Sequence, residues 1–206
     1  MGSYYYLASQ LPCLIYGQAL PMSSAAFRDL ARPLLNGGDE VLLDLVSLDP
    51  GGRAEGPLGD SGPAYADSAP PSGCGFIDRW REWERALRLN LARHRAQRLK
   101  REGDAPVEPP AHPADAAVAA VKAAAAAESP LEAELLLDKA RWDAIEVLQG
   151  INYFDRNTIY AYLLKLFLLE RREAFQVEEG FTEYKSLYAT ILDSVRSGDS
   201  PVGEAK

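Results

Sequence analysis

The chain has 206 residues, of which 47% are hydrophobic and 25% are charged, a balance typical of an ordinary globular protein and not of a disordered one. Acidic residues outnumber basic ones by 30 to 22, and the resulting net charge of −8 argues against a general nucleic-acid-binding protein, because binding to phosphates needs an excess of Lys and Arg. Two cysteines are too few for a disulfide framework or a four-cysteine zinc site.

The first fifty residues predict short elements. The aromatic stretch Tyr4–Ser9 fits either a strand or a helical turn. Ser23 or Ser24 is a suitable N-cap for a helix that ends at the Asn-Gly-Gly of residues 36–38. Asp39 is then the expected cap of a second short helix.

Two stretches rich in glycine and proline interrupt the chain. Residues 49–75 contain seven Gly and five Pro, and residues 103–113 contain four Pro, so neither stretch favours a helix or a regular strand. The tail at 197–206 lacks large apolar residues. We therefore expect one helical domain over residues 1–196 with two flexible loop inserts, followed by a disordered tail.

The remaining segments predict helices. The clearest is 76–101, where apolar residues fall on one stripe at spacings of three and four: Phe76, Trp80, Trp83, Leu87, Leu91 and His94. An alanine-rich stretch after Pro113 favours a second helix, and 131–149 a third. A helix that opens near Asp155 is apolar almost all round through Leu169, as expected of a buried central helix, and Phe181–Val195 predicts a last amphipathic helix. The fold class predicted is an all-α helical bundle.

The helix at 76–101 carries nine basic and three acidic residues. Four of its arginines fall on one flank beside the tryptophan stripe: Arg81, Arg85, Arg88 and Arg95. One interpretation is a docking surface for an acidic partner or for phosphate. The other is a solvated polar face, in which Glu84 and Arg88 pair at a spacing of four residues.

Several residues on the apolar faces have two interpretations. Trp80, Trp83 and Trp142 could stack on nucleobases, but their helical spacing among apolar residues favours a place in the core. Asn90 and Asp138 are polar groups at or near apolar stripes, so each needs a hydrogen-bonding partner. We interpret them as making inter-helix hydrogen bonds or pairing with an arginine, with a catalytic carboxylate as the alternative for Asp138.

No motif predicts a metal, a cofactor or a catalytic residue. His94 and His112 have no Cys or His neighbour at ligand spacing. The glycines at 51–59 lack the Gly-Lys-Ser/Thr ending of a phosphate-binding loop, and there is no nucleophile elbow.

The sequence predicts a cytoplasmic protein. Its first ten residues lack a basic leader and an extended apolar core. The longest apolar run, Ile159–Leu169, is interrupted by Lys165 and falls short of the roughly 20 residues that a spanning helix needs. Cys13 and Cys74 lie among loop-forming residues and are expected to be free thiols.

Three segments together resemble a known family. They are YYYLASQLP with the following FRDLARPLL, then FIDRWREWERALRLNLARHRAQRLKRE, and finally LLLDKARWDAIEVLQGINYFDRNTIYAYLLKLFLLERREAF. The most specific part is the combination of Leu137–Asp143 with Tyr153-Phe154-Asp155. Jointly they resemble a family of bacterial proteins encoded beside the subunits of V-type (A/V-type) rotary ATPases. The two loop inserts lie outside this resemblance.

That family is similar to a reduced form of the central-stalk subunit called C in bacteria and d in eukaryotes, an all-helical funnel on the membrane rotor ring. This chain is too short for the three helical lobes of that subunit. The resemblance implies a non-catalytic part in ion transport, as a stalk-like connector or an assembly factor. It implies the rotor shaft and the ring subunits as partners, and a location peripheral to the inner membrane through the complex.

In this reading the arginine flank docks against acidic surfaces of the ATPase. Close packing of the structural core then gives the stiffness that torque transmission requires. We assign six residues to this core: Trp80, Trp83, Asp138, Trp142, Tyr153 and Phe154. Two alternatives stay open. One is a small helical module that binds RNA or an acidic protein through residues 76–101. The other is an enzyme that uses a carboxylate buried in a pocket, such as Asp138.

Overall fold

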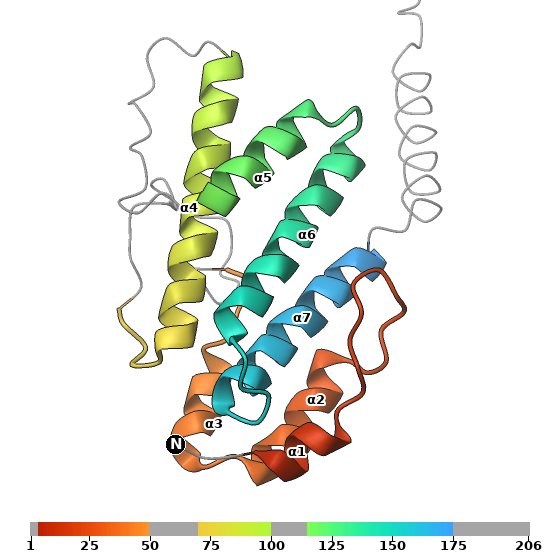
Figure 1. Cartoon of the computed structure of the whole chain (residues 1–206), viewed down its shortest axis with the longest axis vertical. Coiled ribbons are helices and arrows are strands. Elements are labelled where there is room, and N and C mark those ends of the chain that lie inside the picture. The colour runs from red at the N-terminus through yellow and green to blue at the C-terminus, as the bar shows by residue number, and fades with distance from the viewer. Residues whose placement is uncertain (1–3, 50–69, 100–114, 175–206) are drawn as a thin grey trace, which may run out of the picture. The chain divides into compact units, whose positions relative to one another are not determined.

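The computed structural model describes residues 4–49, 70–99 and 115–174, and these residues form helices and no strands (Figure 1). The predicted all-α class is therefore confirmed. Most of the insert at 49–75, all of the insert at 103–113, the helix predicted over 181–195 and the tail at 197–206 lie outside the described residues. The chain divides into two compact units at residues 170 and 171, and the second is described only to residue 174. The single domain over 1–196 stays a prediction.

The N-terminal part forms three short helices and one 3-10 turn. They are α1 (Tyr5–Gln10), α2 (Ser24–Ala31), η1 (Arg32–Leu34) and α3 (Gly37–Asp44). The hydroxyl of Ser23 accepts a hydrogen bond from the backbone N–H of Ala26 and so caps α2 as predicted. The ambiguous aromatic stretch is helical.

The predicted cap of α3 is wrong by three residues. Asn36 is the N-cap, and its side-chain oxygen accepts from the backbone N–H of Asp39 at 2.8 Å. Asn is as good a capping residue as Asp, and the two glycines that follow enter the first turn instead of ending the previous helix. The carboxylate of Asp39 is thereby left free for other partners.

Four longer helices complete the described part: α4 (Gly75–Leu99), α5 (Asp115–Ala126), α6 (Pro130–Gln149) and α7 (Arg156–Ala174). Ser129 caps α6, with Pro130 in its first turn, where the missing N–H costs nothing. Gly150 ends α6 with a φ of 75°, a left-handed value that favours glycine. At the start of α7, Asp155 accepts a hydrogen bond from the N–H of Thr158.

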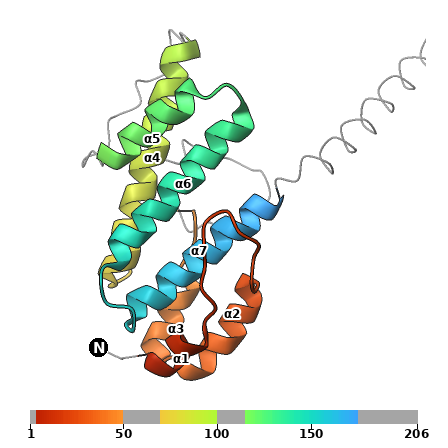
Figure 2. The ribbon, with the colours of Figure 1, turned by 45° about the vertical axis from the view of Figure 1, so that its right-hand side comes forward.

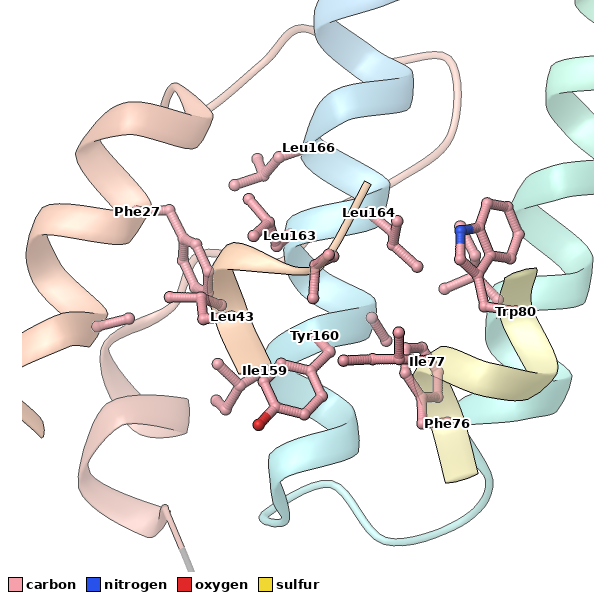
Figure 3. Close-up of a cluster of buried hydrophobic side chains, with 14 of the residues drawn as sticks. Phe27, Leu43, Phe76, Ile77, Trp80, Ile159, Tyr160, Leu163, Leu164 and Leu166 are labelled. Atoms are coloured by element: carbon pink, nitrogen blue, oxygen red, sulfur yellow. The ribbon is translucent and has the colours of Figure 1, made fainter. Parts of the chain in front are cut away.

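The main core surrounds α7, whose side chains are buried on almost every side, as the sequence predicted. Figure 3 shows Phe27 and Leu43 on one side of α7 and the first two turns of α4 on the other. The buried residues of α7 are Ile159, Tyr160, Ala161, Leu163, Leu164, Leu166, Leu168 and Leu169. A central helix of this kind holds its neighbours by burial of apolar surface, which is the dominant favourable term in folding.

A second, smaller core lies between α4, α5 and α6, which contact one another in pairs (Figures 1 and 2). It is rich in alanine and includes Leu87, Ala117, Ala120, Val121, Ala124 and Leu137. Trp83 packs against both cores and stacks on Trp80 with ring centroids 5.8 Å apart. Trp80 and Trp142 are buried, and Trp80 donates to the carbonyl oxygen of Ser47. All three rings therefore pack in or against the cores, as their helical spacing predicted.

Candidate protein-binding surface

The structure divides the predicted arginine flank of α4. Arg81 is buried and donates to the carbonyl oxygen of Leu45. Arg88 donates to Glu84 at 3.0 Å, which confirms the predicted pair within the helix, and to Asp49 at 3.1 Å. These two guanidinium groups fasten the residues after α3 to α4, so the expectation that they form a free docking flank is wrong. Sequence spacing placed them on one flank but gave no sign of the segment that covers it.

The other two arginines of that flank are Arg85, which lies between Arg81 and Arg88, and Arg95, which lies further along α4. Arg85 is half-buried and Arg95 is exposed. Within residues 4–49, 70–99 and 115–174, no ion pair is found for either of them. The four arginines therefore differ in environment: Arg81 and Arg88 bind the residues after α3, whereas, among the described residues, Arg85 and Arg95 do not.

A buried ion-pair network joins α4 to α6. Arg141 donates to Glu84 at 3.1 and 3.2 Å and to Asp138 at 2.7 Å, and all three side chains are at most 6% exposed. Burial alone lowers the pKa of Arg141, but the two carboxylates outweigh burial and raise it. Asp138 is thus buried and paired with an arginine, as predicted.

Asn90 uses its own helix instead of a neighbouring one. Its side-chain amide donates to the carbonyl oxygen of Ala86 at 2.8 Å. The predicted inter-helix hydrogen bond is therefore wrong for this residue. A partner four residues earlier in the same helix was as available as a partner on another helix.

A second buried polar network centres on Asp39 and joins α1, α3 and α7. The hydroxyl of Tyr4 and the side-chain amide of Asn36 both donate to one carboxylate oxygen of Asp39, and Arg156 donates to the other at 3.3 Å. The hydroxyl of Tyr160 donates to the backbone oxygen of Asp39 at 3.2 Å. Helices that are far apart in the sequence are thereby fixed around one carboxylate.

This network shifts the pKa values of its members, Tyr4 and Asp39 among them. Burial, together with the hydrogen bond to Asp39, raises the pKa of Tyr4 to about 12. Burial also acts to raise the pKa of Asp39, but the hydrogen bonds from Tyr4, Arg156 and Asn36 outweigh it and hold that pKa below its ordinary value. The structure therefore favours a protonated phenol beside an ionised carboxylate.

Next to the Asp39 network, large apolar side chains face solvent. The N–H of Tyr4 donates to the carbonyl oxygen of Phe154 at 2.7 Å, and the ring of Tyr5 lies 4.6 Å from that of Phe154. We give the name aromatic surface to a set of residues from α1, the last turn of α6 and the α6–α7 connection. Its members and their exposed fractions are Tyr5 61%, Val147 80%, Ile151 94%, Tyr153 63% and Phe154 41%.

Tyr153 and Phe154 were expected in the core, and this expectation is wrong. Both lie in the connection between α6 and α7, and connecting segments run over protein surfaces because their backbone groups need water or local partners. The sequence did carry a signal: Gly150, Asn152 and Asp155 are turn-forming residues around these aromatics. In this connection the turn-forming residues outweigh the hydrophobicity of the two rings.

The connection that carries the aromatic surface is held in place by its own hydrogen bonds. The side-chain oxygen of Asn152 accepts from the N–H of Phe154, and its backbone oxygen accepts from the hydroxyl of Thr158 at 2.8 Å. With Asp155 capping α7, the loop is fixed to the first turn of the central helix. The exposed rings therefore stand on a rigid support, which lowers the entropic cost of binding a partner.

Over the described residues, no group of three His, Cys, Asp or Glu side chains could hold a metal ion, and no helix is long and apolar enough to cross a membrane. Cys13 and Cys74 are free thiols, the first exposed and the second buried. Comparisons of the chain with models of known families, with curated proteins and with solved structures found no match.

Proposed function

We propose that this protein is a non-catalytic helical connector that binds other proteins, and that it serves a V-type ATPase between the rotor shaft and the membrane ring, in torque transmission or assembly. The aromatic surface is the observation that carries the proposal. The rings of Tyr5 and Phe154 contact each other, and exposed apolar side chains that adjoin one another mark interaction sites on monomeric proteins. Tyrosine and phenylalanine also supply large contact areas at low conformational cost.

The three segments that carry the family resemblance meet in the structure. Tyr4 and Tyr5 of the first segment meet Phe154 of the third at the aromatic surface. Glu84 of the second segment pairs with Arg141 of the third inside the protein. The residues that carry the resemblance are thus those that build this surface and its support.

A mechanical role fits the way the support is built. The central helix α7 is buried among the helices around it, and buried ion pairs link α4 to α6. Protein interiors are close-packed and resist compression, so a load applied at the aromatic surface would be passed to the helices beneath it. The ion binding and the ATP hydrolysis would take place on other subunits.

The test is co-purification of the tagged full chain with the ATPase from its native host, scored by the shaft and ring subunits. We expect Tyr153→Ser with Phe154→Ser to abolish this recovery. Leu131→Ser is the matched control, because Leu131 is also an exposed apolar residue but lies in the first turn of α6, at the opposite end from Val147. An intact, active ATPase that lacks this protein would refute the proposal.

The alternative of an RNA-binding module has less support. Two of the four arginines on the α4 flank, Arg81 and Arg88, bind other residues of the same chain. Phosphate contacts give affinities that fall steeply with salt, so filter binding across a salt series distinguishes this alternative from a protein-binding role.

A further inference from the structure

A groove lies between α4, α5 and α6, away from the aromatic surface. It encloses a hollow of about 180 Å³, and its apolar lining includes Leu91, Val121 and Leu137. The hollow exists because α5 presents alanines to its neighbours, among them Ala124 and Ala125, which allow close approach but leave space unfilled.

The mouth of the groove is basic although the protein as a whole is acidic. His94, Arg95 and Arg98 line it, against the single carboxylate of Glu134, while the chain carries a net charge of −8. Arg95 and Arg98 are exposed, and three residues of separation puts them on one side of α4. An apolar hollow edged by cations selects a ligand that combines an apolar group with acidic neighbours.

The size of the hollow indicates a side chain and not a small-molecule substrate. Pockets for small ligands are usually about 300 to 1,000 Å³, whereas an apolar cavity of about 150 Å³ holds a single benzene ring. A partner helix can place one ring or leucyl group in such a hollow and direct carboxylates one turn away toward the arginines.

We propose that this groove binds an acidic helical segment of a partner protein, which inserts one bulky apolar side chain into the hollow and pairs its carboxylates with Arg95 and Arg98. This is a second docking site beyond the aromatic surface, and it does not depend on the ATPase assignment. A protein with two such sites joins two partners.

The test uses a fluorescein-labelled helical peptide of about 18 residues, long enough to be helical, built from Glu and Ala around one Phe. Anisotropy titrations against the full chain should show saturable binding. Replacing the peptide's Phe by Ala should weaken binding about tenfold or more, as for a hot-spot anchor. Ala125→Phe, which fills the hollow, should have a similar effect with all charges retained.

Charge reversal tests the basic mouth. Arg95→Glu or Arg98→Glu should weaken binding of the acidic peptide about tenfold and improve binding of a sibling peptide that carries Lys in place of Glu. Arg79→Glu, the same change at the exposed start of α4, is the matched control and should leave the affinity unchanged. Circular dichroism checks that each variant is folded.

The proposal is overturned if the peptide shows no saturable binding, if it binds equally well without its Phe, or if Arg95→Glu and Arg98→Glu behave like Arg79→Glu. Competition by vesicles of anionic phospholipid at similar affinity would also overturn it, because the arginines would then serve a membrane surface. Phe154→Ser should retain peptide binding, because the groove does not include the aromatic surface. Failure of the ATPase assignment can therefore be distinguished from failure of the groove proposal.

Discussion

The backbone N–H of Tyr4 donates to the carbonyl oxygen of Phe154, so residues 150 positions apart in the sequence lie side by side at the start of α7. This bond brings the first helix of the chain to the connection between α6 and α7 and places Tyr5 against Phe154. The Asp39 network lies next to it and fixes the same two regions through Tyr4 and Arg156. The exposed aromatic residues therefore depend on buried polar contacts for their position.

Removal of the arginine from the buried network should be strongly destabilising. In Arg141→Met, the carboxylates of Glu84 and Asp138 lose a shared cation inside the protein, and breaking a buried ion pair from one side costs about 3–5 kcal/mol. Urea denaturation followed by circular dichroism measures the free energy of unfolding.

The control for that variant lies two residues away in the same helix. Lys139→Met breaks the exposed pair with Asp143 in the same helix, and such pairs contribute only about 0.3–0.5 kcal/mol. Equal losses of unfolding free energy in Arg141→Met and Lys139→Met would show that burial of the network contributes nothing to stability.

Neutralising Asp39 should destabilise the protein at neutral pH. In Asp39→Asn, the amide that replaces the carboxylate cannot accept from Tyr4, Asn36 and Arg156 together, and Arg156 loses its counter-ion. Hydrogen bonds to charged groups contribute about 1.5–3 kcal/mol, so a loss of about this size is expected in the same urea measurement.

The same variant should change the response to acid. Because the folded protein holds the pKa of Asp39 below its ordinary value of 3.8, the contribution of Asp39 to stability is fully present above pH 3.8 and is lost as the pH falls through the lower, folded pKa. Urea midpoints measured from neutral pH to below pH 3.8 should fall more steeply for the wild type than for Asp39→Asn. Parallel curves would contradict the assignment of this pKa.

Tyr4 should make the protein sensitive to alkali. Its pKa is raised from 10.0 to about 12, so the folded state retains the phenolic proton that the unfolded chain releases. The stabilising contribution is fully present below pH 10 and is lost as the pH rises toward 12. Tyr4→Phe should show a shallower alkaline loss of stability than the wild type, with Tyr5→Phe as an exposed control.

Truncation of the central helix should cost far more than truncation at the aromatic surface. Leu164→Ala opens a cavity at a fully buried position of α7, with an expected loss of about 2–5 kcal/mol. Val147→Ala removes an exposed side chain and should change stability by no more than about 0.5 kcal/mol. A large cost for Val147→Ala would mean that the aromatic surface is part of the fold and not a free binding surface.

Most of the helices, and the burial of the central one, could be predicted from local sequence signals. The 3.6-residue period and capping residues such as Ser23 act over a few positions, because the hydrogen bonds of a helix join residues four apart. The apolar run of Ile159–Leu169 likewise predicted a helix surrounded by others, and the structure has α7 there. Local signals of this kind can be read without knowing what lies across the fold.

Contacts between distant segments set which polar groups are engaged and which aromatic residues face solvent. Arg81 and Arg88 bind residues about 40 positions earlier in the chain. Asp39 accepts hydrogen bonds from the phenol of Tyr4 and the guanidinium of Arg156. The ring of Phe154 contacts that of Tyr5. Periodicity assigns a side chain to one face of its own helix, but the neighbour that covers or exposes that face is set by packing between segments distant in the sequence.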